Sequence, residues 1–296
     1  MAVSTERFLQ YLEREKRYSA HTIIAYRNDL SQFLDYLRHQ YSLEDISQAT
    51  APMIRSWLAE SISGGLSRNS VNRKLSAFKA FFRYALKNDL VQNNPFEKIG
   101  TVKKNKVLPE FVEEEGMNRL LDQSVFEAGF SGKRDRLILV LLYTTGMRLS
   151  ELCQLEHHHF DAGKNTIKIT GKRAKQRIVP VIQEVADDYT DYCTEKEKMF
   201  GSAISSYIFV TDKGHKIYPK FVYRLVTHYL GKVTTRNRKS PHVLRHTFAT
   251  HMLNSGADLN AIKEILGHAN LSATQVYTHN SIEKIKNVYK QAHPKA

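Results

Sequence analysis

The feature that most constrains the fold is a break in the apolar pattern between Asn93 and Pro109. It opens with Asn93-Asn94-Pro95, which ends a helix because the residue before a proline disfavours helical backbone. A chain of 296 residues is long enough for two domains that each bury a core. We therefore predict domains over residues 1–92 and 108–296, joined by a basic linker over residues 93–107. The lysines of this linker suit it either to cross a phosphate backbone or to lie exposed in solvent.

Before the break, apolar residues recur at helical spacing and no strand pattern appears, which predicts an all-helical domain. Ser67 stands where a helix N-cap is expected, and Gly64-Gly65 interrupts the pattern. The predicted helices span residues 5–17, 20–40, 51–62 and 68–88.

After the break the pattern is mixed. Apolar and polar residues alternate in Ile167-Lys168-Ile169 and again in the segment from Arg177 to Val181, around a basic tip at residues 171–176. This alternation predicts a β-hairpin. The predicted helices of this domain span residues 113–124, 132–145, 184–199, 219–231, 243–254, 258–266 and 281–291. The expected fold class is mainly α, with one small β-sheet in the second domain.

Charge narrows the class of partner. The chain carries 44 Lys and Arg against 30 Asp and Glu, a net charge of +14. Residues 1–106 hold 17 basic and 10 acidic side chains, so each half of the chain carries +7. A hydrophobic fraction of 42% is typical of a folded protein rather than a disordered basic chain. Nucleic acid is the favoured partner, although membrane surfaces and ribosomes also attract such charge.

Other compositional features point to the cytoplasm. Two cysteines exclude a disulfide framework and a four-cysteine zinc site, and they suit a reducing compartment. The longest apolar run, from Leu137 to Tyr143, is too short to span a bilayer, so no membrane partner is expected. The N-terminus lacks the charged and apolar regions of a signal peptide. We therefore expect a cytoplasmic protein.

Two arginines stand in otherwise apolar, turned segments, where a guanidinium needs an anionic partner. Arg148 precedes Glu151 by three residues, so on a helix the carboxylate would share its face and orient the guanidinium. The alternative is a plain ion pair within the helix. His242 lies one turn before Arg245, which brings an imidazole and a cation together where a phosphate could bind.

The histidine content raises the question of a metal site. His242 and His246 have the spacing of a helical ligand pair, and residues 157–159 are three consecutive histidines. No His-Glu-x-x-His motif occurs, and three adjacent histidines cannot point one way on a regular element. We expect no metal site, a triplet on the surface, and a His246 that packs on its own domain.

Taken in order, these segments resemble the tyrosine recombinases, the phage integrase family. The resemblance rests on Thr-Gly-Met-Arg148-Leu-Ser-Glu, Gly-Lys172 in the hairpin, His242-Val-Leu-Arg245-His, Leu-Gly-His268 and Tyr277-Thr-His. It covers nearly the whole chain, and its ends look most like the Xer recombinases that resolve chromosome dimers. It implies a two-domain DNA clamp, with a helical core-binding (SAM-like) domain and a catalytic domain. It also implies roles in DNA recombination and integration, chromosome partition and cell division.

The resemblance implies six catalytic residues: Arg148, Lys172, His242, Arg245, His268 and Tyr277. In this scheme the two arginines bind the scissile phosphate and Tyr277 attacks it to form a 3′-phosphotyrosine. Lys172 would protonate the leaving 5′ oxygen, and His242 would accept or orient a proton. His268 would bind the phosphate and position the tyrosine.

The resemblance also implies partners. The covalent intermediate conserves the phosphodiester energy, so no cofactor is expected, and the chain has no phosphate-binding Gly-rich loop and no acidic pair for two metals. The expected partners are a duplex DNA site and a tetramer, of this chain alone or with a paralogous recombinase, on two such sites. A DNA translocase is a further candidate. The alternatives are a mobile-element integrase, a type IB topoisomerase and a DNA-binding protein without catalysis.

The resemblance leaves two alternatives for the C-terminal segment and two for the candidate DNA-binding side chains. Ile282, Ile285, Val288 and Tyr289 could form the apolar face of a segment passed to a neighbouring subunit, or could dock on their own domain. Basic and amide side chains on the 68–88 helix, beside the hairpin tip and on a later helix could reach phosphates or base edges, or could be solvated surface groups. These DNA-binding candidates are Arg68, Asn72, Arg73, Lys79, Arg173, Lys175, Arg177 and Arg224.

Overall fold

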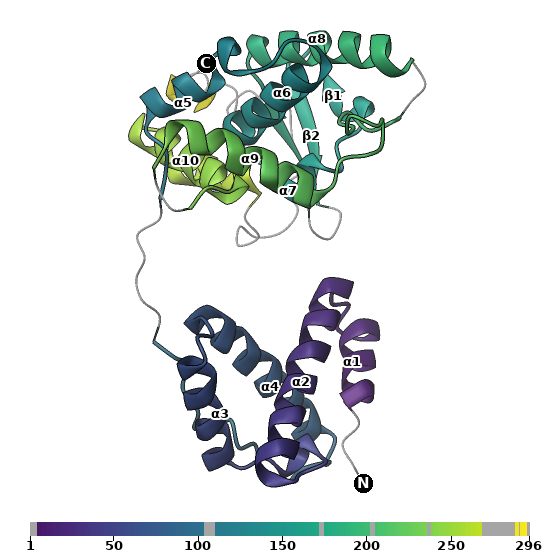
Figure 1. The fold of residues 1–296 in the computed structure, drawn as a ribbon, viewed down its shortest axis with the longest axis vertical. Helices are drawn as coiled ribbons and strands as arrows, with labels where there is room; N and C mark the ends of the chain where they lie inside the picture. The colour runs from purple at the N-terminus through teal and green to yellow at the C-terminus, as the bar shows by residue number, and fades with distance from the viewer. Residues whose placement is uncertain are drawn as a thin grey trace. The chain divides into compact units, whose positions relative to one another are not determined.

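The chain divides into two compact units, Met1–Val107 and Leu108–Ala296, which are described separately (Figure 1). The computed structural model describes residues 5–103, 110–171, 175–201, 205–235, 238–267, 288–289 and 291–294. Within these residues, no helix combines the length and the apolar character needed to cross a membrane.

The first unit contains the four predicted helices: α1 (Thr5–Arg14), α2 (Ala20–Tyr41), α3 (Ala51–Ser63) and α4 (Arg68–Lys87). Side-chain oxygens cap two of them, since Ser19 accepts from the Thr22 N–H and Ser67 from the Ser70 N–H. Helix α1 ends three residues before the predicted boundary, and Arg17, with φ of 50°, turns the chain toward α2. The core is aromatic: the Phe33 and Phe78 rings stack with centroids 4.7 Å apart.

The segment that follows α4 packs back on this unit. Phe96 is fully buried in the aromatic core, Ile99 is 5% exposed, and Val102 lies against the same cluster. The described part of the predicted linker, up to residue 103, therefore belongs to the first unit instead of lying free in solvent. Residues 104–107 lie outside the described part of the chain.

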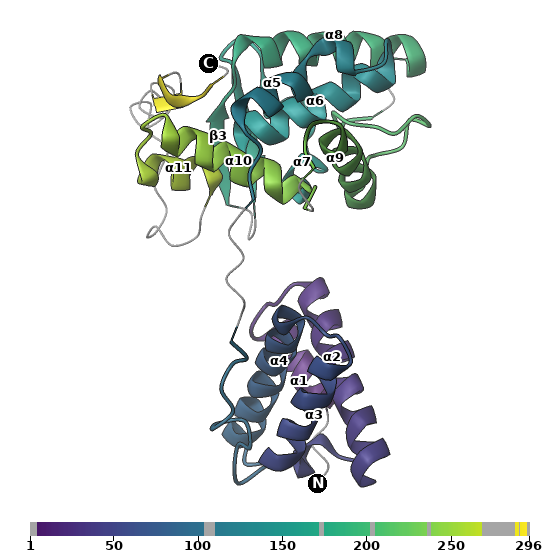
Figure 2. The ribbon, with the colours of Figure 1, turned by 60° about the vertical axis from the view of Figure 1, so that its left-hand side comes forward.

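The second unit surrounds one long apolar helix. Its helices are α5 (Glu114–Leu121), α6 (Phe130–Thr145), α7 (Leu149–Leu152), α8 (Gln183–Phe200), α9 (Pro219–Val233), α10 (Pro241–Asn254) and α11 (Leu259–Leu266). Because residues 137–143 are all apolar, α6 is buried on every side, with α8 and α10 packed against it. Helix α11 lies against β3 and α10 (Figure 2).

The predicted hairpin is confirmed as β2 (Thr166–Thr170) and β3 (Gln176–Pro180), which pair antiparallel with Ile167 opposite Val179. A third strand, β1 (Phe160–Asp161), completes the sheet in the order β1-β2-β3. The sequence pattern missed β1 and α7, which are only two and four residues long. These elements are too short to show a period of alternation or of helical repeat.

Near the C-terminus the chain docks on its own unit. Tyr289 is 2% exposed and its hydroxyl donates to the carbonyl of Thr144 at 2.9 Å. Its ring stacks on His293, with centroids 4.8 Å apart. Most of the predicted 281–291 helix, including Ile282 and Ile285, lies outside the described residues.

Candidate active site

The site begins at the turn between α6 and α7. Gly146 ends α6 with a φ of 58°, and Arg148 is the N-cap of α7 in extended conformation. The Glu151 carboxylate accepts from the Arg148 backbone N–H at 2.9 Å and from Arg148 Nη1 at 2.8 Å. The predicted pair therefore exists, but the prediction that the two share a helix face was wrong. Arg148 instead precedes the helix as its N-cap, and the carboxylate of Glu151, the third residue of α7, reaches back to the Arg148 N–H.

A second arginine completes the partners of Glu151. Arg177 on β3 donates from Nη1 to Oε1 at 3.1 Å and from Nη2 to Oε2 at 2.7 Å. The Arg177 and Glu151 side chains are 5% and 3% exposed. Burial alone would raise the pKa of Glu151, but the bonds and charge of Arg177 and the bonds from Arg148 hold that pKa below its ordinary value. Arg177, predicted to reach DNA, is buried instead, because its side chain pairs with this carboxylate.

Three arginines converge on the C-terminal end of α11, where Gly267 in left-handed conformation ends the helix. The bonds run from Arg177 Nε to Ile265 O at 2.7 Å, from Arg245 Nη2 to Leu266 O at 2.8 Å, and from Arg148 Nη2 to Gly267 O at 3.3 Å. The last carbonyls of a helix lack partners within the helix and carry a partial negative charge. Successive carbonyls thus hold the three guanidinium groups at one place.

Arg245 and His242 come from the first turns of α10. Arg245 also donates from Nη1 to the carbonyl of Gly146 at 2.5 Å, so it joins the α6 turn to the end of α11. Burial, followed by repulsion from Arg148 and Arg177, lowers the pKa of Arg245 to about 10, so it is still a cation at neutral pH. His242 is exposed, whereas His246 is half-buried. Arg245 therefore lies in the arginine cluster, and His242 lies one turn before it on α10.

The other catalytic candidates, Lys172, His268 and Tyr277, lie outside the described residues, as does Arg173. Their described neighbours in sequence are part of the site. The Gly171 N–H donates to the Lys175 carbonyl at 2.7 Å, which closes the hairpin. A Cβ on Gly171 would lie 3.3 Å from Glu151 Oε1, and one on Gly267 would lie 3.2 Å from Arg177. The residues that precede Lys172 and His268 therefore flank the Glu151–Arg177 pair.

On α4, three of the predicted DNA contacts bind the chain itself. Asn72 is 8% exposed and forms two bonds of 2.8 Å with the backbone of Val102, one as donor and one as acceptor. Lys79 donates to Ile99 O at 2.5 Å, and Arg68 donates to Lys103 O at 3.0 Å. These side chains hold the segment after α4 against the helix, and the prediction for Asn72 was wrong because that segment covers it.

The remaining candidates differ in exposure. Arg73 pairs with the buried Asp29 but its side chain is 48% exposed. Lys175 and Arg224 are exposed, and Arg224 donates to the Tyr218 hydroxyl at 3.3 Å. Exposure leaves these three cations accessible to phosphate.

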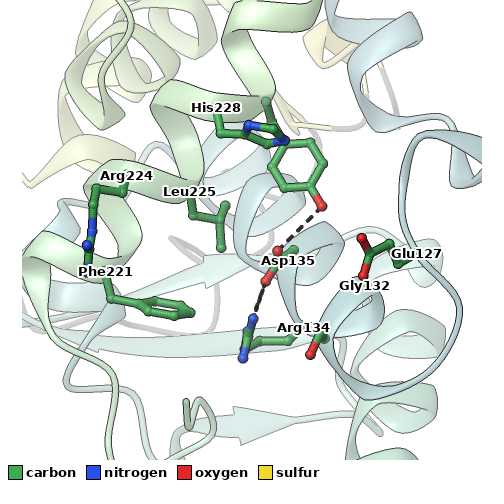
Figure 3. Close-up of a pocket in the computed structure, with 10 residues that line it drawn as sticks. Glu127, Gly132, Arg134, Asp135, Phe221, Arg224, Leu225 and His228 are labelled. Atoms are coloured by element: carbon green, nitrogen blue, oxygen red, sulfur yellow. Dashed lines mark hydrogen bonds and ion pairs between the residues drawn. The ribbon is translucent and has the colours of Figure 1, made fainter. Parts of the chain in front are cut away.

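Figure 3 shows a separate hollow between α6 and α9, with a volume of about 360 Å³. Arg224, His228 and Asp135 line it, and Asp135 accepts from Arg134 at 2.9 Å and from Tyr229 at 3.4 Å. None of its lining residues belongs to the arginine cluster, so this hollow is distinct from the candidate active site.

The histidine triplet forms a 3₁₀ turn. The triplet was expected to lie on the surface, but part of it does not. His157 is half-buried, with Nδ1 2.8 Å from the Tyr189 hydroxyl and Nε2 3.1 Å from Lys196 Nζ. Burial and the Lys196 charge lower the pKa of His157. Across the described ranges, no three His, Cys, Asp or Glu side chains gather in a way that could hold a metal ion.

Sequence reasoning missed the role of Arg177 as the partner of Glu151. The available signal was the alternation itself, since Arg177 lies two residues from Val179 and therefore on the buried face of β3. A charged residue on a buried strand face requires a counter-charge in the core. Glu151, in an apolar segment, is the carboxylate that meets this requirement.

Comparisons with known proteins agree with the fold. Residues 110–284 match the phage integrase family, and residues 5–89 match the phage integrase N-terminal SAM-like domain. The chain belongs to this family of tyrosine recombinases.

Similar proteins indicate which kind of tyrosine recombinase this chain is. The chain is 37% identical to tyrosine recombinase XerC of Chlorobaculum tepidum, over 98% of this chain and 94% of that protein. It is 36% identical to XerC of Bacillus pumilus, over 98% and 95%. A XerH recombinase solved with its palindromic difH substrate after cleavage has the same fold, with a TM-score of 0.73, 23% identity, and 97% and 84% coverage. The activity of the chain is site-specific DNA recombination of the Xer type.

Proposed function

We propose that this recombinase cuts each DNA strand with Tyr277 while Arg148 and Arg245, the arginine pair, hold the non-bridging oxygens of the scissile phosphate. The observation that carries the proposal is the convergence of the pair on adjacent carbonyls, Leu266 and Gly267, at the end of α11. The two guanidinium groups come from different segments, the α7 N-cap and α10. A bond to Glu151 holds Arg148 in place, and a bond to the carbonyl of Gly146 holds Arg245. A guanidinium has several N–H donors in a rigid fork, and such a fork matches a phosphate.

The chemistry needs one nucleophile and one acid. The Tyr277 oxygen attacks phosphorus, the bond from phosphorus to the 5′ oxygen breaks, and a 3′-phosphotyrosine forms. The 5′ oxygen leaves as a hydroxyl with a proton from Lys172, and the phenol proton passes to a base, for which His242 is the candidate. His268 hydrogen-bonds the phosphate. Attack by a 5′-hydroxyl from the second DNA site reverses these steps and joins the strands, so no cofactor is consumed.

The arginine pair lowers the barrier by charge. Attack on a phosphodiester by a phenolate builds a doubly negative transition state, and fixed cations stabilise it without reorganising at the moment of reaction. A phenol with a pKa of about 10 is ionised in roughly one molecule per thousand at neutral pH, so nearby cations also favour the reactive form of Tyr277.

In this proposal the second unit carries the chemistry and the first unit binds duplex DNA beside the cut site, through accessible cations such as Arg73. Four subunits, of this chain alone or with a paralogous recombinase, act on two sites in the cytoplasm. The similarity to XerC proteins over nearly their full length supports a role in resolving chromosome dimers. A DNA translocase that brings the two sites together would complete the system.

The experiment that tests this function uses a nicked duplex that traps the covalent intermediate. Tyr277→Phe should abolish the protein–DNA adduct while the dissociation constant for DNA stays within about threefold, because only the nucleophilic oxygen is lost. An adduct formed by Tyr277→Phe would exclude the mechanism. Two intact target duplexes should yield a Holliday junction, and relaxation of supercoiled DNA without a junction would instead indicate a topoisomerase. Cleavage should persist after treatment with EDTA.

A further inference from the structure

A third cation belongs to the cluster, although the proposed chemistry gives it no phosphate to bind. Arg177 uses Nη1 and Nη2 on the Glu151 carboxylate and Nε on the carbonyl of Ile265. Its side chain is 5% exposed, compared with 37% for Arg148. Arg177 is therefore enclosed by the protein, whereas Arg148 is partly exposed to solvent.

The net charge of the arginine cluster can be compared with the charge of the transition state. Arg148, Arg177 and Arg245 contribute three positive charges and Glu151 one negative charge, which gives a net charge of +2. This equals in magnitude the charge of the doubly negative transition state. Without Arg177 the same cluster would carry +1, because Glu151 would neutralise the guanidinium of Arg148 that it contacts at 2.8 Å.

Arg177 also connects the segments that carry the arginine pair. Through Glu151 it reaches Arg148, the N-cap residue that precedes α7. Through Ile265 O it reaches the end of α11, where the next two carbonyls accept from Arg245 and Arg148. A single buried guanidinium thus fixes both ends of the frame that holds the pair.

We infer that Arg177 is a positioning residue for the recombination reaction, which balances the Glu151 charge and so leaves the full charge of Arg148 and Arg245 for the scissile phosphate. The inference rests on the proposed role of the arginine pair. It also separates Glu151 and Arg177 in function: Glu151 orients Arg148, and Arg177 prevents that same carboxylate from cancelling the charge of Arg148.

The test compares Arg177→Met with Arg177→Met/Glu151→Gln on the trapping duplex. The single variant leaves a net charge of +1, and its cleavage rate constant at saturating protein should fall about 100-fold. The double variant restores +2 and should regain about tenfold of that loss. Arg177→Lys keeps the charge but cannot form the two-point bond to Glu151, so its rate should lie between those of the wild type and Arg177→Met.

A second substrate separates a charge effect from a folding defect. A methylphosphonate at the cut site replaces one non-bridging oxygen with a methyl group, so its transition state carries one negative charge less. We expect the defect of Arg177→Met to shrink to within about tenfold of the wild type on this substrate. An equal defect on both substrates, or a double variant as slow as the single one, would refute the positioning role. The melting temperature of each variant identifies any loss of folded protein.

Arg148→Ala is the matched control for the proposed function itself. It should also cleave the methylphosphonate better, relative to the wild type, than it cleaves the phosphodiester. If Arg148→Ala shows no such preference, the proposed role of the arginine pair fails. If Arg148→Ala shows the preference and Arg177→Met does not, the arginine pair stands and only the inference about Arg177 is wrong.

Discussion

Among the described residues, each unit buries a carboxylate between two cations, Asp29 in the first and Glu151 in the second. The two sites differ in which segments of the chain their cations connect. In the first unit, Asp29 on α2 is 1% exposed and pairs with Arg73 and Lys74 of α4. Both cations are neighbours in sequence on one helix. The ion pairs of Asp29 therefore join two helices, α2 and α4.

In the second unit, Glu151 pairs with Arg148 and Arg177, which come from an N-cap and a strand. Each of these arginines has a further donor on the end of α11. Because one carboxylate and two cations give the same net charge in both units, charge alone cannot distinguish them. Exposure does not distinguish them either, since Arg73 and Arg148 are both partly exposed. The difference is that the cations of Glu151 join separate segments at the end of α11, whereas those of Asp29 lie on one helix.

The sharpest test of this contrast is Arg148→Lys. An ammonium cannot reproduce the fork that bonds Glu151 and Gly267 and faces the phosphate, so cleavage should slow about 1000-fold, or about 4 kcal/mol in the barrier. Single-turnover cleavage measures this. Arg119→Lys, which changes an exposed arginine that pairs with Glu115 on α5, should leave the rate unchanged. Near-normal cleavage by Arg148→Lys would remove the distinction between the two units.

Asp29→Asn should affect stability instead of chemistry. It leaves the buried ammonium of Lys74, 8% exposed, without its counter-charge, and should lower the free energy of unfolding by about 3 kcal/mol. Trp57, the one tryptophan of the chain, is buried in this unit, so its fluorescence in urea reports the loss directly. Asp35→Asn, at an exposed ion pair, should change the midpoint little. A reduced cleavage rate in folded, DNA-bound Asp29→Asn would contradict the comparison.

Asn72→Ala tests the bonds that hold the chain after α4. It removes both hydrogen bonds to Val102 and leaves its half-buried carbonyl and N–H without their partner. The free energy of unfolding should fall by about 2 kcal/mol, again followed through Trp57. The control Asn69→Ala changes an exposed amide on the same helix and should stay within about 0.5 kcal/mol. Equal effects would show that Asn72 does not secure this segment.

The smallest effect concerns pH. Since the folded pKa of Glu151 lies below its ordinary value, its contribution to stability is present above the unfolded pKa, near 4.5, and is lost as pH falls through the folded pKa. Each unit of pKa difference corresponds to about 1.4 kcal/mol. Thermal unfolding followed by circular dichroism should show this acid loss in the wild type and a smaller one in Glu151→Gln. Identical acid profiles would place Glu151 outside the stabilising network.

The sequence predicted the fold where the apolar pattern is long. The four N-terminal helices and the hairpin follow directly from helical and alternating periods. The pattern could not predict that Phe96 returns to the aromatic core, because that contact joins residues far apart in sequence. For the same reason Asn72 looked solvent-facing, although the chain 30 residues later covers it.

Within the site, residue identities were more predictable than geometry. The pairing of Arg148 with Glu151 follows from their spacing, but the helix starts after Arg148, so a cap replaces the expected shared face. Arg177 was assigned to DNA because its neighbours are basic, whereas its strand face is buried. The catalytic roles of all six residues, Arg148, Lys172, His242, Arg245, His268 and Tyr277, remain predictions.

The carbonyls that hold the three arginines belong to the main chain, and this affects how the site can change over generations. Any residue at positions 265 and 266 supplies the same acceptor, so substitutions there are limited by packing in the core and not by the bond itself. Gly267, with φ of 65° and Arg177 3.2 Å from a Cβ, is the exception. Sequence drift can therefore replace nearly every side chain around α11 and still leave the arginines in place, provided that the helix ends at the same residue.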